Sequence, residues 1–221
     1  MNNLIIGDGG MGSELRFRGV EVPSHVESIW SALALIDNPE VIKQIHLDYI
    51  EAGAEYITVN NYAVTQPILE RVGMSDRLED LTLLSISLAN EAVKESGKNI
   101  MIAGSLPPLE TSYRADLIQD TSKMADQYGE LAEILEGQVD IILCETMANS
   151  DEGRIALSSI QNDSSNISAE NDHWSSASVI DEKTYTDEVS KWIDEGATIL
   201  AGCCRTRPSH IKEMTERLKQ K

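Results

Sequence analysis

The strongest constraint on the fold is an alternation of short apolar runs with longer segments whose apolar residues recur every three or four positions. The apolar runs predict five strands, at residues 4–7, 56–60, 100–104, 140–145 and 198–202. The periodic segments predict one helix that begins near residue 39, two with apolar stripes over 81–92 and 124–135, and one that begins at residue 208. Alternating strands and helices are typical of a parallel α/β sheet with helical crossovers, either doubly wound or closed into a barrel.

The helix near residue 39 has the clearest ends. Asn38 is a good N-cap, and Pro39 suits the first helical position, where a missing N–H has no consequence. Gly53 is placed to end the helix, because glycine adopts the left-handed conformation after a C-cap without strain. We therefore expect one helix over residues 39–52.

One segment breaks the alternation. Ser, Asn and Asp fill 12 of the 20 positions in residues 162–181, so no apolar period survives there and we expect a loop or a seam. Five strand–helix units fall short of the eight in a closed barrel, and 221 residues is close to that fold's lower limit of about 200. We expect a single domain over residues 1–221, of the (β/α)₈ TIM-barrel type but incomplete.

The charge balance excludes one class of function. The chain has 18 Lys and Arg against 37 Asp and Glu, a net charge of −19, whereas binding to nucleic-acid phosphates needs a basic surface. No apolar stretch approaches the length of a membrane span, and residues 1–10 lack the pattern of a signal peptide. We therefore expect no nucleic-acid partner, no membrane span and a cytoplasmic location, where the three cysteines stay reduced.

Polar residues directly follow the predicted strands. Because the carboxyl ends of parallel strands share one rim, where ligands bind in such folds, we expect these residues to converge on one site. They are Asp8, Asn60, Asn61, Ser105, Glu145, Cys203 and Cys204. Asp8 also suits an ordinary turn, and Asn60 and Asn61 suit caps and turns as well as ligand binding, so both interpretations stay open for these three.

The adjacent pair Cys203 and Cys204 contains the most chemically reactive groups among these candidates. Neighbouring Cα atoms lie about 3.8 Å apart, below the usual disulfide range of about 4.4–6.8 Å, so a bridge between them would be strained. Thiolates select zinc among the common divalent ions, and a catalytic zinc typically has three protein ligands and one open position. The alternative is that one or both cysteines only pack, since free cysteine is often buried. The histidines show no metal-ligand spacing and are interpreted as structural or solvated: His25, His46, His173 and His210.

Four stretches, taken in order, resemble the homocysteine S-methyltransferase family. They are DGGMGSEL at residues 8–15, WSALALIDNPEVIKQIHLDYIEAGAEYITVNNY at 30–62, LCETM at 143–147 and AGCCRTRPSHI at 201–211. The last is similar to the family's Gly-Gly-Cys-Cys zinc motif, with Ala201 in place of the first glycine. The resemblance covers nearly all of residues 1–160 and 185–215.

The resemblance implies a (β/α)₈ barrel that uses Zn²⁺ to transfer a methyl group to the thiol of homocysteine, forming methionine. It implies that Cys203 and Cys204 are catalytic zinc ligands, and that Asp8 and Glu145 hold the substrate ammonium group. The full set of implied substrate-binding residues is Asp8, Gly9, Asn60, Asn61 and Glu145. A zinc-bound thiol is deprotonated and therefore ready to attack an activated methyl group. The implied donor is a small cation, either S-methylmethionine, S-adenosylmethionine or betaine, and an acidic chain suits all three.

One feature of the family has no counterpart in the chain. The family's third cysteine ligand lies in a Val-Asn-Cys type motif between the Glu-Thr and Cys-Cys motifs, where this chain has residues 162–181. Cys144 is a poor substitute, because side chains alternate along a strand and Cys144 points away from the site if Glu145 points into it. The chain is therefore either an active methyltransferase or a shortened, weak or inactive relative that binds an amino acid or zinc. A third possibility is that the sequence lacks an internal piece of a longer chain. An open barrel edge also predicts either self-association or marginal stability, with residues 162–181 near the gap and readily cleaved by protease.

Overall fold

The computed structural model describes residues 4–24, 28–112, 120–160, 166–168, 181–194 and 196–219. These residues form an α/β structure whose strand pairs are parallel. The strands are β1 (Ile5–Ile6), β2 (Tyr56–Thr58), β3 (Met101–Leu106), β4 (Ile141–Cys144), β5 (Asn166–Ser168) and β6 (Ile199–Leu200).

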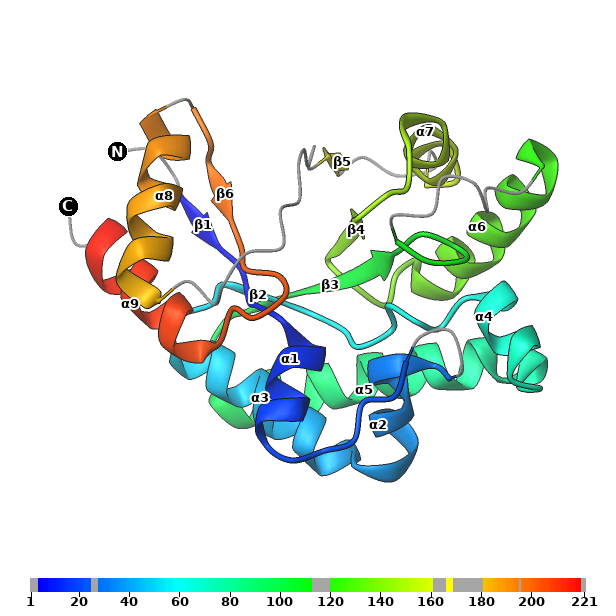
Figure 1. Ribbon diagram of the computed structural model, residues 1–221, viewed down its shortest axis with the longest axis horizontal. Helices are drawn as coiled ribbons and strands as arrows, with labels where there is room; N and C mark the ends of the chain where they lie inside the picture. Colours follow the sequence, from blue (N-terminus) through cyan, green and yellow to red (C-terminus); the bar gives the residue numbers. More distant parts are fainter. Residues whose placement is uncertain are drawn as a thin grey trace.

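The strands lie in the order β6–β1–β2–β3–β4–β5 (Figure 1). β1 pairs with β6 in one sheet, whereas β2 to β5 form a second sheet in sequence order. A single parallel bridge between Gly7 and Tyr56 joins the two sheets. Within the described part of the chain, β5 and β6 are therefore the two ends of an arc and do not pair with each other.

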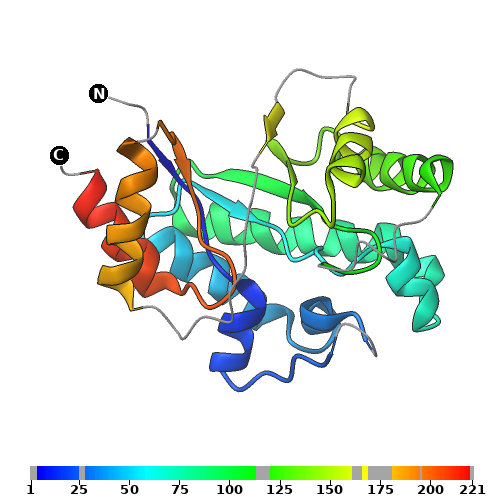
Figure 2. The same ribbon diagram turned by 45° about the horizontal axis from the view of Figure 1, so that its top comes forward.

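The helices lie on the outside of this arc (Figures 1 and 2). They are α1 (Met11–Phe17), α2 (Leu33–Asp37), α3 (Pro39–Glu51), α4 (Gln66–Arg71), α5 (Leu78–Ser96), α6 (Thr121–Leu135), α7 (Ser150–Ser158), α8 (Glu182–Asp194) and α9 (Pro208–Leu218). Short 3₁₀ turns precede α2 and α5, at Trp30–Ala32 and Ser75–Arg77. The larger helices contact one another in the order α8, α9, α3, α5, α6 and α7, so each covers the strands nearest to it.

Helix α3 begins and ends where the sequence predicts. Pro39 is in its first turn and Asn38 is its N-cap, although no side-chain hydrogen bond from Asn38 caps the helix. The backbone carbonyl of Asn38 instead accepts from the N–H of Val41. Gly53 follows the C-cap with φ = 104°, a conformation that strains any residue with a Cβ atom.

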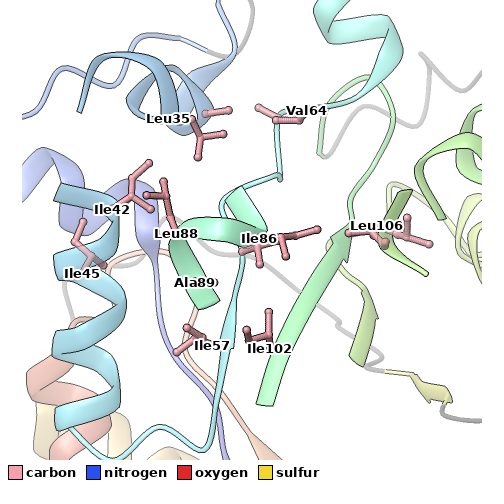
Figure 3. Packing of buried hydrophobic residues seen from close by; sticks show 14 of the residues in the cluster. Leu35, Ile42, Ile45, Ile57, Val64, Ile86, Leu88, Ala89, Ile102 and Leu106 are labelled. Atoms are coloured by element: carbon pink, nitrogen blue, oxygen red, sulfur yellow. The ribbon is translucent and has the colours of Figure 1, made fainter. Parts of the chain in front are cut away.

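The main hydrophobic core lies between the β2–β3 part of the sheet and helices α3 and α5 (Figure 3). Ile57 of β2 and Ile102 of β3 meet buried residues from both helices, which include Ile42, Ile45, Ile86, Leu88 and Ala89. Burial of each large aliphatic side chain contributes about 1.5–3 kcal/mol. This layer therefore anchors the strands from whose ends the polar rim projects.

All five predicted strands are present with slightly different ends, and the four predicted helices are α3, α5, α6 and α9. The sequence patterns do not indicate β5, because its backbone pairing with β4 leaves no signal in the polar composition of residues 162–181. They also do not indicate α1, α2, α4, α7 and α8, of which four are too short for a clear period. His25, His173 and most of residues 162–181 lie outside the described residues. Among the helices that the structure describes, none is long and apolar enough to cross a membrane.

Candidate active site

The carboxyl ends of the strands surround a cavity of about 350 Å³. Of the seven site residues that the family resemblance implies, its wall includes all but Asn61: Asp8, Gly9, Asn60, Glu145, Cys203 and Cys204. They belong to the loops after β1, β2, β4 and β6. The structure thus brings together two carboxylates and two thiols from distant parts of the chain.

Asp8 follows β1 and is only 5% exposed. Its Oδ2 accepts from the backbone N–H of Thr58 (2.8 Å), and its Oδ1 accepts from the Thr58 hydroxyl (3.0 Å). Burial raises the pKa of Asp8 to about 7, the bonds from Thr58 oppose this rise, and the nearby Glu145 adds to it. Asp8 therefore ties β1 to β2 and presents a carboxyl group that a bound cation would keep ionised.

Glu145 follows β4 and faces the same cavity. Its Oε1 accepts from the Ser105 hydroxyl at 2.6 Å. Burial raises the pKa of Glu145, the bond from Ser105 opposes this rise, and the nearby Cys204 adds to it. Two carboxyl groups with raised pKa values at one cavity are typical of a functional site, here one suited to a cation.

Asn60 and Asn61 both use their side-chain amides inside the protein. Asn60 accepts from the Ser31 hydroxyl (2.9 Å) and donates to the Ser31 carbonyl (2.8 Å). Asn61 is fully buried and exchanges two hydrogen bonds with the backbone of Ser105, at 2.9 and 3.1 Å. Of the two, Asn60 reaches the cavity wall, and Asn61 links the loop after β2 to β3.

Cys203 and Cys204 follow β6, and both are free cysteines. The Sγ atom of Cys203 donates to that of Cys204 across 3.9 Å. This hydrogen bond holds the pKa of Cys204 below its usual range and raises the pKa of Cys203. The pair therefore loses its first proton more readily than an isolated thiol does, whereas loss of the second needs a cation to share the charge.

The separation of the two sulfur atoms suits zinc. Sulfur ligands about 2.3 Å from a tetrahedral zinc ion lie about 3.8 Å from each other, and the two Sγ atoms are 3.9 Å apart. In the part of the chain that the structure describes, no group of three His, Cys, Asp or Glu residues could hold a metal ion. Cys144 packs against the core, as the alternation with Glu145 predicts, and burial raises the pKa of its thiol to about 11. The chain thus supplies two thiols that fit zinc.

The loop that carries these thiols lies directly against the loop after β1. A Cβ atom on Gly10 would lie 2.5 Å from the carbonyl oxygen of Cys203, so only glycine allows this approach. The N–H of Gly10 donates to the Thr206 carbonyl (3.1 Å), and the N–H of Gly202 donates to the Asp8 carbonyl (2.7 Å). These bonds place Asp8 and the thiols side by side.

Three non-glycine residues near the cavity have a left-handed backbone. They are Trp30 (φ 46°), Thr146 (φ 55°) and Arg205 (φ 67°). Trp30 and Thr146 line the cavity, and Arg205 follows Cys204. Such conformations cost about 1–3 kcal/mol each and cluster at functional sites. No sequence pattern marks these positions.

The remaining wall combines apolar and aromatic side chains with few charges. The rings of Trp30 and Tyr62 pack edge to face, with centroids 5.7 Å apart. Glu110 adds a third acidic group to the wall, and Arg16 adds a basic one. Sequence reasoning missed Ser31 and Thr58, because a hydroxyl residue gives no sign of which distant polar group it binds.

Comparisons with known proteins agree on one family. A family model described as homocysteine S-methyltransferase matches residues 5–182 and 164–218. The homocysteine S-methyltransferase YbgG of Bacillus subtilis is 30% identical, over 98% of this chain and 74% of its own. Homocysteine S-methyltransferase 1 of Arabidopsis thaliana is 25% identical, over 97% and 93%. The crystal structure of the homocysteine methyltransferase MmuM from Escherichia coli, in its metallated form, has a similar fold, with a TM-score of 0.78 and 22% identity over 97% of this chain and 96% of that chain.

The lengths of these matches differ in an informative way. The alignment with the Arabidopsis thaliana protein runs over 311 positions, although this chain has 221 residues, so that relative has many residues without a counterpart here. The two matches to the family model overlap over residues 164–182, which places their junction in the Ser- and Asn-rich segment.

Proposed function

Because the chain belongs to the homocysteine S-methyltransferase family, we propose that it transfers a methyl group from a cationic donor to the thiol of homocysteine, forming methionine. The observation that carries the proposal is the cavity where Asp8, Glu145 and the Cys203–Cys204 pair meet. Homocysteine has an ammonium group for the carboxylates and a thiol for a zinc site. The cavity volume of about 350 Å³ lies within the range of small-molecule sites.

Asp8 and Glu145 bind the ammonium group of homocysteine in this proposal. Each carboxylate already accepts hydrogen bonds on one side, from Thr58 and Ser105, which hold it in place. The remaining lone pairs face the cavity and make charge-assisted hydrogen bonds to the ammonium. Gly9, Asn60 and Asn61 also belong to the substrate site in this proposal. Gly9 and Asn60 reach the cavity wall, and Asn61 holds the loop after β2 to β3.

Cys203 and Cys204 would hold a zinc ion, which would also bind the thiol of homocysteine. Zinc, when bound, keeps a thiol ligand deprotonated at neutral pH. The homocysteine sulfur would then form a bond to the methyl carbon as the donor's S⁺–CH₃ or N⁺–CH₃ bond breaks. The electron pair of that bond stays on the donor's sulfur or nitrogen atom, which becomes uncharged. The chain's part is to align the two substrates and to exclude water.

The donor is a small cation in this proposal, namely S-methylmethionine, S-adenosylmethionine or betaine. Two observations support a cationic group on the donor: the carboxyl groups of Asp8 and Glu145 in the cavity wall, and the net charge of −19 of the whole chain. The site also needs free thiols, which fits a reducing compartment such as the cytoplasm.

For the fold we propose an incomplete (β/α)₈ barrel that forms one domain. The parallel order β6–β1–β2–β3–β4–β5 supports it, as do the match of the family model in two pieces and the extra residues of the Arabidopsis thaliana relative. Among the described strands, β5 and β6 each have one unpaired edge, so we propose self-association there. Size-exclusion chromatography with light scattering tests this, and a compact monomer would contradict it.

A second candidate is a shortened relative that binds zinc or an amino acid without turnover. The specific observation in its favour is the missing third ligand among the described residues.

One experiment separates the two candidates. The purified chain is loaded with zinc and assayed for methionine from homocysteine with each of the three donors, while zinc content is measured on the same sample. Methionine that depends on zinc supports the methyltransferase. Bound zinc with no methionine from any donor supports the second candidate instead.

A further inference from the structure

The carboxylate of Glu14 in α1 joins two arginines near the thiol loop, the segment of residues 201–207 that carries Cys203 and Cys204. Glu14 is only 2% exposed. Its Oε1 accepts from two nitrogens of Arg18, both at 3.2 Å, and its Oε2 accepts from Nε of Arg207 at 3.0 Å. A buried carboxylate is costly unless it is paired, so this side chain is held firmly in both directions.

The two arginines lead to different parts of the protein. Arg18 also binds Asp48 in α3, so this branch joins two helices away from the cavity. Arg207 is the N-cap of α9 and lies three residues after Cys204, so the other branch leads to the thiols. The guanidinium carbon of Arg207 lies 3.2 Å from the ring centroid of Phe17, which places this group between two residues of α1.

Further bonds attach the same loop to α1 and its neighbours. The N–H of Arg205 donates to the hydroxyl of Ser13 at 2.8 Å. The Thr206 carbonyl accepts from the hydroxyl of Tyr49 at 2.9 Å, in addition to the bond from Gly10. In both ribbon views the loop between β6 and α9 passes close to α1 (Figures 1 and 2). The left-handed backbone of Arg205 therefore sits between contacts that fix it.

We propose that Glu14 is a positioning residue for the metal thiolates, and that it acts through Arg207. Glu14 anchors Arg207, the N-cap residue of α9. It thereby holds the thiol loop in the conformation that keeps the two Sγ atoms at the spacing of zinc ligands. The inference rests on the proposed role of Cys203 and Cys204 as zinc ligands. Neither Glu14 nor Arg207 lines the cavity, so the proposed role of these two residues does not involve contact with the substrate.

The experiment compares the two branches in the metal-free full chain. Arg207→Met and Arg18→Met each remove one arginine and leave the other on Glu14, so they are matched in chemistry. Cobalt(II) is titrated as a probe, with the thiolate-to-cobalt absorption band as the signal. Arg207→Met should lower cobalt affinity by about tenfold or more, as loss of outer-shell support does in metal sites, whereas Arg18→Met should change it little. Thermal unfolding is measured on both variants, because a merely structural role would lower both midpoints and leave the cobalt affinities equal.

Further variants keep the outcome decisive. Glu14→Gln should lower the cobalt affinity as Arg207→Met does, and if Arg207→Met does not fold, Arg207→Lys replaces it. A trivalent arsenical, phenylarsine oxide, bridges two thiols without zinc or substrate, and Arg207→Met should slow its binding more than Arg18→Met does. Equal effects of the two arginine variants on both probes would overturn the inference. Failure of the wild type to form methionine would overturn the proposed function alone, because neither probe depends on turnover.

Discussion

The two sides of the strand arc differ in how well they are packed. In β3, five of six residues are buried, whereas in β4 only Ile141 of four is buried. β3 is covered by α5 and α6 and pairs with β2 and β4, whereas β4 pairs on its outer side with the three-residue β5. The Glu145 carboxylate thus projects from the thinner side, while the thiol loop is attached to α1 beside β1.

Because of this difference in packing, we expect the β1–β3 side and the β4 side to have different roles. The β1–β3 side has a buried core and a network of bonds, so it can hold a metal site in a fixed geometry. Among the described residues, the β4 side has fewer neighbours, so it contributes less to stability. In the proposed function it supplies a substrate contact through Glu145. We expect mutations on the first side to affect the metal or the fold, and mutations on the second side to affect substrate affinity.

The largest expected effect is on the metal. Cys203→Ala or Cys204→Ala should release zinc and abolish methionine formation, because each thiolate supplies binding energy and charge compensation. Cys144→Ala is the matched control, since this thiol packs against the core and should keep full zinc content. Zinc is measured by elemental analysis after gel filtration. Equal zinc content in all three variants and the wild type would remove the thiols from the metal site.

A pair of isoleucines tests the packing difference directly. Ile102 of β3 is 5% exposed and Ile142 of β4 is half-buried. Ile102→Ala should lower the free energy of unfolding by about 3 kcal/mol, and Ile142→Ala by about 1 kcal/mol, because a less buried site loses fewer contacts and leaves a smaller cavity. Urea denaturation measures both values. Equal losses would mean that the two sides are equally well packed in solution.

The packed side should also be the acid-sensitive side. His46 in α3 is fully buried, neither ring nitrogen has a hydrogen-bond partner, and burial lowers its pKa from 6.5 to about 4. The unfolded chain takes up this proton near pH 6.5 and the folded chain only near pH 4, so stability falls as pH falls between these values, by about 3 kcal/mol in total.

A variant separates this effect from the titration of the acidic residues. His46→Leu removes the ring and leaves every carboxylate in place. The loss of unfolding free energy between pH 7 and pH 4.5 should therefore be smaller in the variant than in the wild type. The same loss in both proteins would show that His46 does not contribute to the acid sensitivity.

Local features of the fold could be predicted from the sequence, whereas contacts between distant residues could not. Asn38, Pro39 and Gly53 were sufficient to predict α3, because caps and backbone conformations are local properties. The strand ends also predicted five polar residues of the cavity wall, whereas Asn61 and Ser105, predicted with them, are not part of that wall. The bonds of Glu14 to Arg207 and of Asp8 to Thr58 were not predictable, since they join residues far apart in the chain that have no shared pattern. β5 was missed for the related reason that it pairs through its backbone.

The smallest expected effect concerns the thin side, where Glu145→Gln keeps the shape of the side chain and removes its charge. Homocysteine affinity should fall by about 1.5–3 kcal/mol, the contribution of a charge-assisted hydrogen bond, with little change in the unfolding free energy. Asp8→Asn makes the same change on the packed side, but Asp8 also accepts two bonds from Thr58 that join β1 to β2, so this variant should lose stability as well as affinity. Calorimetry on zinc-loaded protein gives the affinities, and urea denaturation gives the stabilities. If Glu145→Gln instead lost stability and kept its affinity, Glu145 would act through Ser105 as part of the scaffold, and the division of tasks between the two sides would be wrong.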